Sequence, residues 1–302
     1  MDFIPKLGSV GITGTLWAVE VECGYEWVQL KEGAWSVRSL REQETFHPVV
    51  GPEKEAETLY VRQLNLEQRI ASTPSPLVLW DVGLGAAANA IVALRHLERV
   101  GGHLQLLSFD HTLEPLRFAV KRPDRLSYLA GWEEDLTALA QDGQISRRRG
   151  ALQIDWRVVE GDFPTLLESG IPLEAPHAIF FDAYSPATNT VMWTLPVFEG
   201  IFRRLNPNRP CSLATYSRST LVRSTLLRAG FFVGSGEATG EKEETTIAAN
   251  RPELVPRILG AEWLQRAYRS TSAEPLHGPH YVKKPLAPET REILERHPQF
   301  RR

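Results

Sequence analysis

The chain has 302 residues, of which 42% are hydrophobic, and its formal net charge is −3. This length supports one large domain with appendages, and the charge excludes a global basic field that would draw the protein to nucleic acid or membrane. Cys23 and Cys211 have no C-x-x-C partner, so we expect neither a metal site nor a disulfide scaffold. The N-terminus lacks a secretory pattern, and the longest apolar run contains Asp81, which predicts a cytoplasmic protein without a membrane span.

Residues 1–75 predict a small N-terminal β module followed by a helix. The segment 16–37 is rich in Trp, Val, Tyr and Leu and is interrupted by glycine turns, a pattern typical of an antiparallel meander. A helix is predicted to begin at Gly51-Pro52-Glu53, where apolar residues follow at helical spacing. The Thr-Pro-Ser-Pro linker at residues 73–76 then places a domain boundary after residue 75.

The segment 76–250 alternates strands and helices. Apolar runs predict seven strands, at residues 77–81, 104–109, 153–159, 178–181, 212–216, 231–233 and 245–249. We therefore predict an α/β domain with a doubly wound, mostly parallel, seven-stranded sheet of the Rossmann-like kind, closed by a hairpin. The long segment between the second and third strands is expected to cap one sheet edge. Residues 251–302 predict a C-terminal tail, packed on the domain or partly disordered.

A glycine motif follows the first strand of this domain. Gly83, Gly85 and Ala88 fit the spacing G-x-G-x-x-G/A, which permits a tight turn and a close ligand approach. The following helix N-terminus offers unpaired N–H groups. We predict that a nucleotide-like cofactor sits on Val82–Ala87, and the alternative is a tight turn of the kind found in any α/β protein.

Four acidic residues end predicted strands at one sheet edge, where ligands bind in doubly wound folds. They are Asp81, Asp110, Asp162 and Asp182. Each alone is more typical of a helix cap or a solvated turn, but all four together predict a nucleoside-bearing cofactor.

The acid before the glycine turn favours a cationic cofactor. Asp81 would repel a pyrophosphate, whereas it suits the amino group of S-adenosylmethionine. In this interpretation Asp81 binds the amino end, Asp110 the ribose hydroxyls and Asp162 the adenine amino group. Aromatic rings near the sulfonium would add cation–π attraction. The candidates are Tyr184, Trp193 and Tyr216, of which Trp193 is the one more typical of core packing.

The segment 180–193 is a buried strand that leads into a loop rich in turn formers. Loops at a rigid strand edge often carry catalytic groups. If the acceptor is an amine, the carboxylate of Asp182 can hold it and accept its proton. The alternative is that Asp182 only caps the following loop.

A family resemblance rests on three segments of the chain. They are Phe-Asp-Ala-Tyr-Ser-Pro-Ala-x-Asn-x-x-Met-Trp at 181–193, Leu-Ala-Thr-Tyr-Ser at 213–217 and Leu-x-x-Ala-Gly-Phe at 226–231. The chain resembles the methyltransferase part of the tRNA 5-methylaminomethyl-2-thiouridine biosynthesis protein, in a stand-alone form without the flavin oxidase domain. The glycine motif through Asn89 is similar to that of the family, and residues 44–48 with Gly51-x-x-x-Glu55 resemble its front pattern loosely.

The resemblance covers residues 27–250 and implies a function. It implies methyl transfer from S-adenosyl-L-methionine to the aminomethyl nitrogen of a modified wobble uridine in tRNA, with Asp182 at the reacting amine. It adds Leu84 and Asn89 to the cofactor-binding residues, beside Asp81, Gly83, Gly85, Asp110 and Asp162. The expected substrate-binding residues are Tyr184, Asn189, Trp193 and Tyr216.

One segment departs from the family pattern. At residues 238–244, Glu241 and Glu243 replace two basic residues of the family, which removes expected phosphate contacts. Basic residues elsewhere are candidates to compensate, and these are Arg147–Arg149, Arg203, Arg204, Arg209, Arg218, Arg223 and Arg228. Two alternatives stay open: a small-amine methyltransferase or aminopropyltransferase on the same fold, and a non-catalytic RNA- or nucleoside-binding module.

Overall fold

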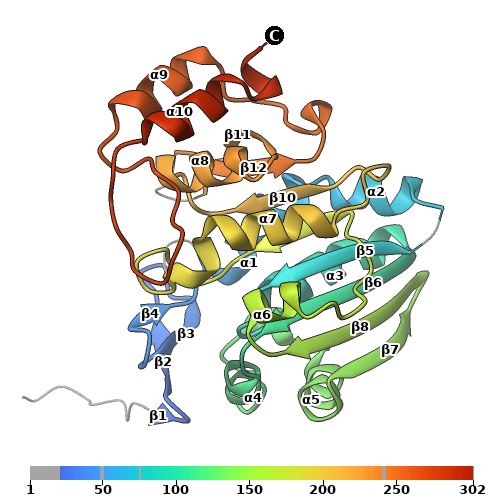
Figure 1. Cartoon of the computed structure of the whole chain (residues 1–302). Coiled ribbons are helices and arrows are strands. Elements are labelled where there is room, and N and C mark those ends of the chain that lie inside the picture. Colours follow the sequence, from blue (N-terminus) through green and yellow to red (C-terminus); the bar gives the residue numbers. More distant parts are fainter. Residues whose placement is uncertain (1–20, 48–50, 75, 240–242, 302) are drawn as a thin grey trace, which may run out of the picture.

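The computed structural model describes residues 21–47, 51–74, 76–239 and 243–301 (Figure 1). Within them the chain forms a four-stranded antiparallel sheet and an eight-stranded mixed sheet covered by helices. The part of the predicted meander at 16–20, and residues 240–242 of the altered segment with Glu241, lie outside the described residues.

The N-terminal sheet is the predicted meander, in the order β1-β2-β3-β4. Its strands are β1 (Val21–Glu22), β2 (Tyr25–Gln29), β3 (Trp35–Ser39) and β4 (Glu44–Thr45). The ring of Trp27 stacks on Phe118 of helix α4 (Glu114–Val120) at a centroid distance of 4.7 Å. This apolar contact attaches the small sheet to the main domain.

The helical part of the first module packs elsewhere. Helix α1 (Pro52–Ala56) continues into a π-helical segment, η1 (Glu57–Arg62), and α2 (Leu66–Ser72) follows. All three contact α3 (Ala88–Val100), which covers the large sheet. The predicted boundaries after residues 75 and 250 stay predictions. The helical segments before the first boundary pack directly on α3, which follows it.

The large sheet has the strand order β11-β12-β10-β9-β5-β6-β8-β7. Its strands are β5 (Leu77–Val82), β6 (Gly102–Asp110), β7 (Gln144–Arg149), β8 (Leu152–Glu160), β9 (Ala178–Phe181), β10 (Ser212–Thr215), β11 (Phe232–Gly236) and β12 (Thr245–Ala249). The strands from β10 to β8 are parallel, whereas β12 runs antiparallel to both β10 and β11. The predicted fold class and its closing hairpin are confirmed.

The sheet contains one strand more than the seven predicted. Strand β7 pairs antiparallel with β8 at the sheet edge, within the segment expected to cap that edge. Only Ile145 of β7 is buried, and Arg147–Arg149 complete the strand. Because an exposed edge strand needs no apolar alternation, the sequence pattern did not reveal it. The same segment also forms α4, η2 (Ser127–Leu129) and α5 (Glu133–Asp142).

Alternate residues of β5 point into two separate apolar cores. Leu77 and Leu79 belong to the core that includes residues of α3 and α5, whereas Val78 and Trp80 belong to the core on the opposite face. That second face is covered by α6 (Phe163–Glu168), α7 (Leu195–Arg204) and α8 (Thr220–Arg228) (Figure 1). Both faces of β5 are therefore buried, which explains its continuous apolar pattern.

The described part of the C-terminal segment lies against β11 and α8. It contains η4 (Pro252–Leu254), α9 (Ala261–Arg269), α10 (Pro288–Glu295) and η5 (Pro298–Phe300). The Gln299 side chain accepts a hydrogen bond from Val233 N at 2.7 Å and donates to Val233 O at 2.9 Å, so it pairs with the edge strand as a neighbouring strand would. None of the helices in the described ranges combines the length and apolar character that a membrane crossing requires.

Candidate active site

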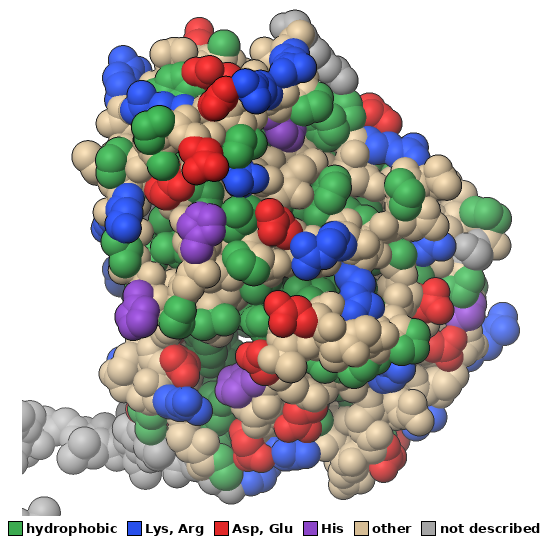
Figure 2. Space-filling view, viewed as in Figure 1, with side chains coloured by type: hydrophobic (Ala, Val, Ile, Leu, Met, Phe, Trp, Pro, Cys, Tyr) green, Lys and Arg blue, Asp and Glu red, His purple; other side chains and the backbone are tan. Residues whose placement is uncertain are grey.

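A cavity of about 780 Å³ opens at the carboxyl ends of β5, β6, β8 and β9. The end of the N-terminal sheet, residues 41–47, forms another wall. Figure 2 shows this face of the molecule hollowed beside the N-terminal sheet. The described lining includes six carboxylates against one arginine and two histidines, and the carboxylates are Glu42, Glu44, Glu55, Asp110, Asp162 and Asp182. The lining therefore favours a cationic ligand.

The glycine turn between β5 and α3 forms the floor of the cavity. Gly83 has a φ of +98°, and a Cβ there would lie 2.7 Å from the carbonyl oxygen of Asp182. Gly85 has a φ of +52°, and a Cβ would lie 3.2 Å from the Phe46 ring. Gly83 is thus required by the backbone atoms of Asp182 as well as by its own φ, whereas a Cβ at Gly85 would crowd the Phe46 ring. Leu84 lies between them on the lining.

Asp110 and Asp162 both line the cavity, and both also stabilise the loops that carry them. Asp110 Oδ2 accepts a hydrogen bond from Gly85 N at 2.9 Å, which joins the glycine turn to the end of β6. Its contact with His111 raises the pKa of that imidazole. Asp162 caps α6 by accepting from Thr165 N at 3.1 Å. Contacts of these two carboxylates with the ribose and the adenine stay predictions.

Asp182, the predicted catalytic residue, follows β9 and lines the cavity. Tyr60 Oη donates to its Oδ1 at 2.8 Å, and Asn89 Nδ2 donates to its Oδ2 at 2.7 Å. Asn89 is only 3% exposed and is not part of the lining, so the structure places it behind Asp182, although we predicted that it binds the cofactor. The two donors fix the orientation of the carboxylate in the cavity.

Tyr60 is a site residue that the sequence analysis missed. Burial, together with the charge of Asp182, raises the pKa of its phenol well above 10, so at neutral pH it remains a hydrogen-bond donor. Its ring packs on Phe180 at a centroid distance of 4.6 Å. Tyr60 falls on the apolar face of a predicted helix, and the sequence does not show that this stretch is π-helical, a form often found at functional sites.

Asp81 lies beneath the cavity and not on it. It is 1% exposed, and its Oδ2 accepts a hydrogen bond from Ser108 Oγ at 2.8 Å. Burial raises the pKa of this carboxyl to about 8. The reason is strand alternation: Asp81 belongs to β5 itself and shares the α3 face of the sheet with Leu79. The predicted contact with the amino end of the cofactor has no support in this geometry.

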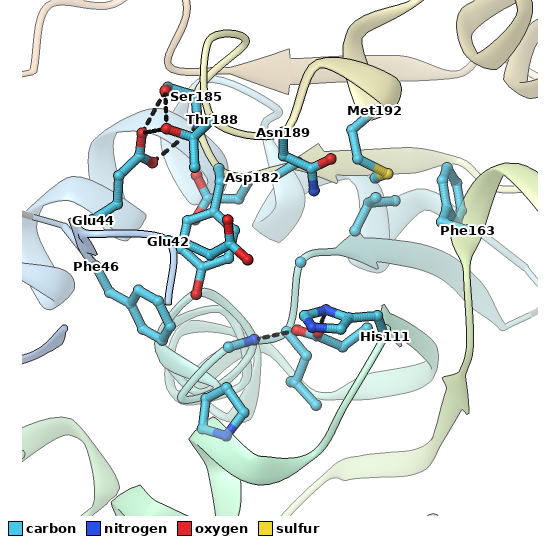
Figure 3. A pocket seen from close by; sticks show the side chains of 18 of the residues that line it. Glu42, Glu44, Phe46, His111, Phe163, Asp182, Ser185, Thr188, Asn189 and Met192 are labelled. Atoms are coloured by element: carbon cyan, nitrogen blue, oxygen red, sulfur yellow. Dashed lines mark hydrogen bonds and ion pairs between the residues drawn. The ribbon is translucent and has the colours of Figure 1, made fainter. Parts of the chain in front are cut away.

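The loop at residues 183–189 is held by Glu44 of the N-terminal sheet (Figure 3). Glu44 accepts hydrogen bonds from Ser185 N at 3.0 Å and from Thr188 Oγ1 at 2.5 Å, and also from the Ser185 hydroxyl. Glu44 stands in the loosely matching front pattern of the sequence, but nothing there indicated its partner. The small sheet therefore positions the loop that follows Asp182.

Three of the four predicted substrate-binding residues line the cavity: Tyr184, Asn189 and Tyr216. Figure 3 shows the Asn189 amide directed into it. Trp193 is fully buried and donates to Tyr184 O at 2.7 Å, so it supports the loop from behind. This is the core-packing role that was the favoured alternative for Trp193.

Most of the arginines proposed to contact phosphate have internal partners. Arg223 is 2% exposed and donates to Thr245 O at 2.8 Å and to Glu244 at 3.0 Å. Arg147 and Arg149 both bind Asp135, while Arg204 and Arg209 donate to backbone carbonyls. Arg203 and Arg218 are exposed. The expectation of a phosphate contact is therefore wrong for the buried Arg223.

The residues 132–251 match a family model described as S-adenosyl-L-methionine-dependent methyltransferase. The chain contains a methyltransferase domain of this kind. S-adenosyl-L-methionine is its cofactor, in agreement with the acidic lining and the glycine turn at the strand ends. No group of three or more His, Cys, Asp or Glu among the described residues is placed to hold a metal ion.

Relatives of the methyltransferase domain confirm the resemblance found in the sequence. The tRNA 5-methylaminomethyl-2-thiouridine biosynthesis bifunctional protein MnmC of Aeromonas hydrophila is 27% identical over 239 residues, covering 70% of this chain and 33% of the relative. MnmC of Caulobacter vibrioides is 28% identical over 246 residues, covering 73% and 39%. The matched part of the chain thus spans 33% to 39% of the length of these relatives.

A solved structure confirms the fold of the methyltransferase domain. The crystal structure of MnmC2 from Aquifex aeolicus superposes with a TM-score of 0.66 at 24% identity, covering 90% of this chain and 83% of that one. The similarity extends beyond the large sheet, since residues 76–250 alone are too short to account for this coverage.

Proposed function

We propose that this protein methylates the aminomethyl nitrogen of a modified wobble uridine in tRNA, converting 5-aminomethyl-2-thiouridine to 5-methylaminomethyl-2-thiouridine. The names of the MnmC relatives support this substrate. The observation that carries the proposal is the carboxylate of Asp182, which Tyr60 and Asn89 hold on the lining of an acidic cavity. The proposal places the protein in the cytoplasm with its substrate.

The cofactor-binding part of the proposal rests on the glycine turn and the neighbouring acids. When bound, S-adenosyl-L-methionine supplies an electrophilic methyl group. The floor of the cavity carries no side chain at Gly83 and Gly85, which lie on either side of Leu84. Asp110 and Asp162 offer acceptor oxygens for hydroxyl and amino groups.

Asp182 has the position and chemistry required to bind an amine. Each oxygen of a carboxylate has two lone pairs. Tyr60 donates to Oδ1 and Asn89 to Oδ2, and His47 Nε2 lies 3.9 Å from Oδ2. Further lone pairs remain for an ammonium group. By accepting one proton from that group, Asp182 exposes the nitrogen lone pair that methyl transfer requires. Asn189, Tyr184 and Tyr216 surround the acceptor in this arrangement.

Nucleoside analysis tests the proposed function directly. Undermethylated tRNA is incubated with the protein and S-adenosyl-L-methionine, digested and analysed by mass spectrometry. We expect 5-aminomethyl-2-thiouridine to gain one CH₂ unit. Parallel reactions with putrescine, and with decarboxylated cofactor, test the small-amine and aminopropyl alternatives. Modification of putrescine without any change in the tRNA nucleoside would refute the proposal, whereas calorimetric binding of cofactor without any turnover would indicate the non-catalytic alternative.

A further inference from the structure

An exposed loop, residues 277–285, begins directly after Leu276, which bridges to Thr194 near the cavity-lining Met192, and we call it the rim loop. Apart from the half-buried Gly278, all of its residues are exposed, including Tyr281 at 36% and Val282 at 44%. In Figure 1 it belongs to the long red segment that descends from α9 and α10 toward the loop before α7. It contains two lysines and two histidines, and the nearest carboxylates in the sequence are Glu274 and Glu289.

Both ends of the rim loop are fixed. Leu276, which is buried, accepts a hydrogen bond from Leu195 N at 2.7 Å and bridges to Thr194. At the other end, Lys284 O accepts from Ala273 N at 2.9 Å and from Glu274 N at 3.0 Å. A loop whose ends are tied together and contain prolines loses little conformational entropy on binding a ligand.

The anchor places the rim loop beside the substrate side of the cavity. Val191 and Met192 line the cavity in η3 (Thr190–Trp193), and the bridge to Leu276 follows at the next residue after that element. The chain segment that carries Asn189 and Met192 is therefore the one to which the rim loop is attached.

The charge distribution indicates what kind of partner the rim loop meets. The six carboxylates of the cavity lining repel a phosphate backbone, so an RNA substrate needs cations outside the cavity. Arg223 is buried against Glu244, and the basic family segment is replaced by acids at Glu241 and Glu243. The rim loop supplies adjacent cations, Lys283 and Lys284, together with the exposed ring of Tyr281.

We infer that the rim loop binds the single-stranded RNA that flanks the acceptor nucleotide, with Lys283 and Lys284 at phosphates and Tyr281 stacked on a base. This inference rests on the proposed tRNA substrate. Cations next to an exposed aromatic ring are the combination that binds unpaired RNA, since the ring stacks on a base while the cations neutralise the backbone. The Lys283 ammonium lies 6.0 Å from the centre of the Tyr281 ring, which places charge and stacking surface together.

Fluorescence anisotropy of the full-length protein with a labelled anticodon stem-loop RNA, over a series of salt concentrations, tests the inference without turnover. The double variant Lys283→Ala/Lys284→Ala is expected to bind about tenfold more weakly, and its log–log salt slope falls by ~1.4 for two lost contacts. Tyr281→Ala weakens binding by about fivefold or more, and Tyr281→Phe restores it. The control Lys31→Ala/Arg99→Ala removes two exposed cations elsewhere and leaves binding unchanged.

Two outcomes would overturn the inference: equal affinity and salt slope in the rim-loop and control double variants, or no RNA binding by the wild type at low salt. The nucleoside assay separates this failure from failure of the proposed function. If the wild type methylates tRNA and the rim-loop variants keep its KM, the inference fails and the function stands. If the variants lose RNA affinity but the wild type never modifies tRNA, the RNA surface stands and the function fails.

Discussion

Tyr60 donates a hydrogen bond to Asp182 across a separation of 122 residues in the sequence, at 2.8 Å. The two residues belong to different layers, since η1 lies in the helix layer and Asp182 follows β9. Together with Asn89, this bond determines how the carboxylate faces the cavity. The front segment of the chain is therefore part of the active site and not only an attachment to it.

Replacing Tyr60 by Phe removes this hydrogen bond and keeps the ring that packs on Phe180. Because a hydrogen bond to a charged group is worth roughly 1.5–3 kcal/mol, we expect kcat to fall about 10-fold to 100-fold while cofactor affinity is kept. Tyr268→Phe is the matched control, since Tyr268 donates to Glu295 at 3.0 Å far from the cavity. Unchanged kcat in Tyr60→Phe would remove Tyr60 from the positioning of Asp182.

Asp182→Asn keeps the size of the side chain and removes its ability to accept a proton. We expect methyl transfer to fall by roughly 10²-fold to 10⁴-fold, with cofactor binding by calorimetry close to that of the wild type. Asp110→Asn provides the contrast, because Asp110 lies at the glycine turn and is expected to affect cofactor affinity first. Wild-type turnover in Asp182→Asn would show that the amine loses its proton to another group.

Glu44→Gln tests whether the N-terminal sheet positions the loop 183–189. One Glu44 oxygen accepts from Ser185 N, and the other accepts from both the Ser185 and the Thr188 hydroxyls. A Gln side chain has a single acceptor oxygen and cannot replace both, so we expect kcat/KM for tRNA to fall about tenfold. Glu42→Gln removes the same charge from the lining, but Glu42 is paired with Arg41 and not with the loop. Equal effects of the two variants would assign the loss to charge alone.

The buried carboxyl of Asp81 predicts a pH-dependent stability. Burial raises its pKa from 3.8 to about 8, so between these values the folded protein holds a proton that the unfolded chain has lost. The free energy of unfolding therefore decreases as pH rises through this range, by about 1.4 kcal/mol per pH unit at most, and levels off above it. The Asp81→Asn variant has no titrating group at this position and does not lose stability in this way. The Tm of the variant minus the Tm of the wild type should therefore increase from pH 5 to about pH 8. Asp142→Asn at the exposed end of α5 is the control, and an equal Tm difference at every pH would contradict the prediction.

Arg223 is expected to contribute to stability and not to RNA binding. Its removal takes one hydrogen bond from Thr245 O and one from the Thr246 hydroxyl, both inside the protein. We expect Arg223→Met to lower the free energy of unfolding in urea by roughly 2–4 kcal/mol, and the exposed neighbour Arg218→Met to change it by less than about 0.5 kcal/mol. Anisotropy with the stem-loop RNA should show equal affinity for wild type and Arg223→Met. A selective loss of affinity at unchanged stability would reverse this assignment.

The apolar runs, the glycine turn and the acids at strand ends determined the fold class and the edge of the sheet that holds the cavity. They do so because strand alternation and turn chemistry are local properties of the chain. The central run at 181–193 likewise indicated Asp182 and the loop that follows it as part of the site. Strand β7 escaped prediction because an edge strand with one buried residue has no apolar pattern.

Only the tertiary structure decided which residues work together. In the sequence, Tyr60 is typical of a helix core and Glu44 of a surface acid. The structure makes both of them site residues, because Tyr60 contacts Asp182 across 122 residues and Glu44 contacts Ser185 across 141 residues. Asp81 shows the converse, because its place on the buried strand turns it away from the cavity although it is adjacent to the glycine turn. Side-chain partners across such separations depend on how layers pack, and no local pattern in the sequence encodes that packing.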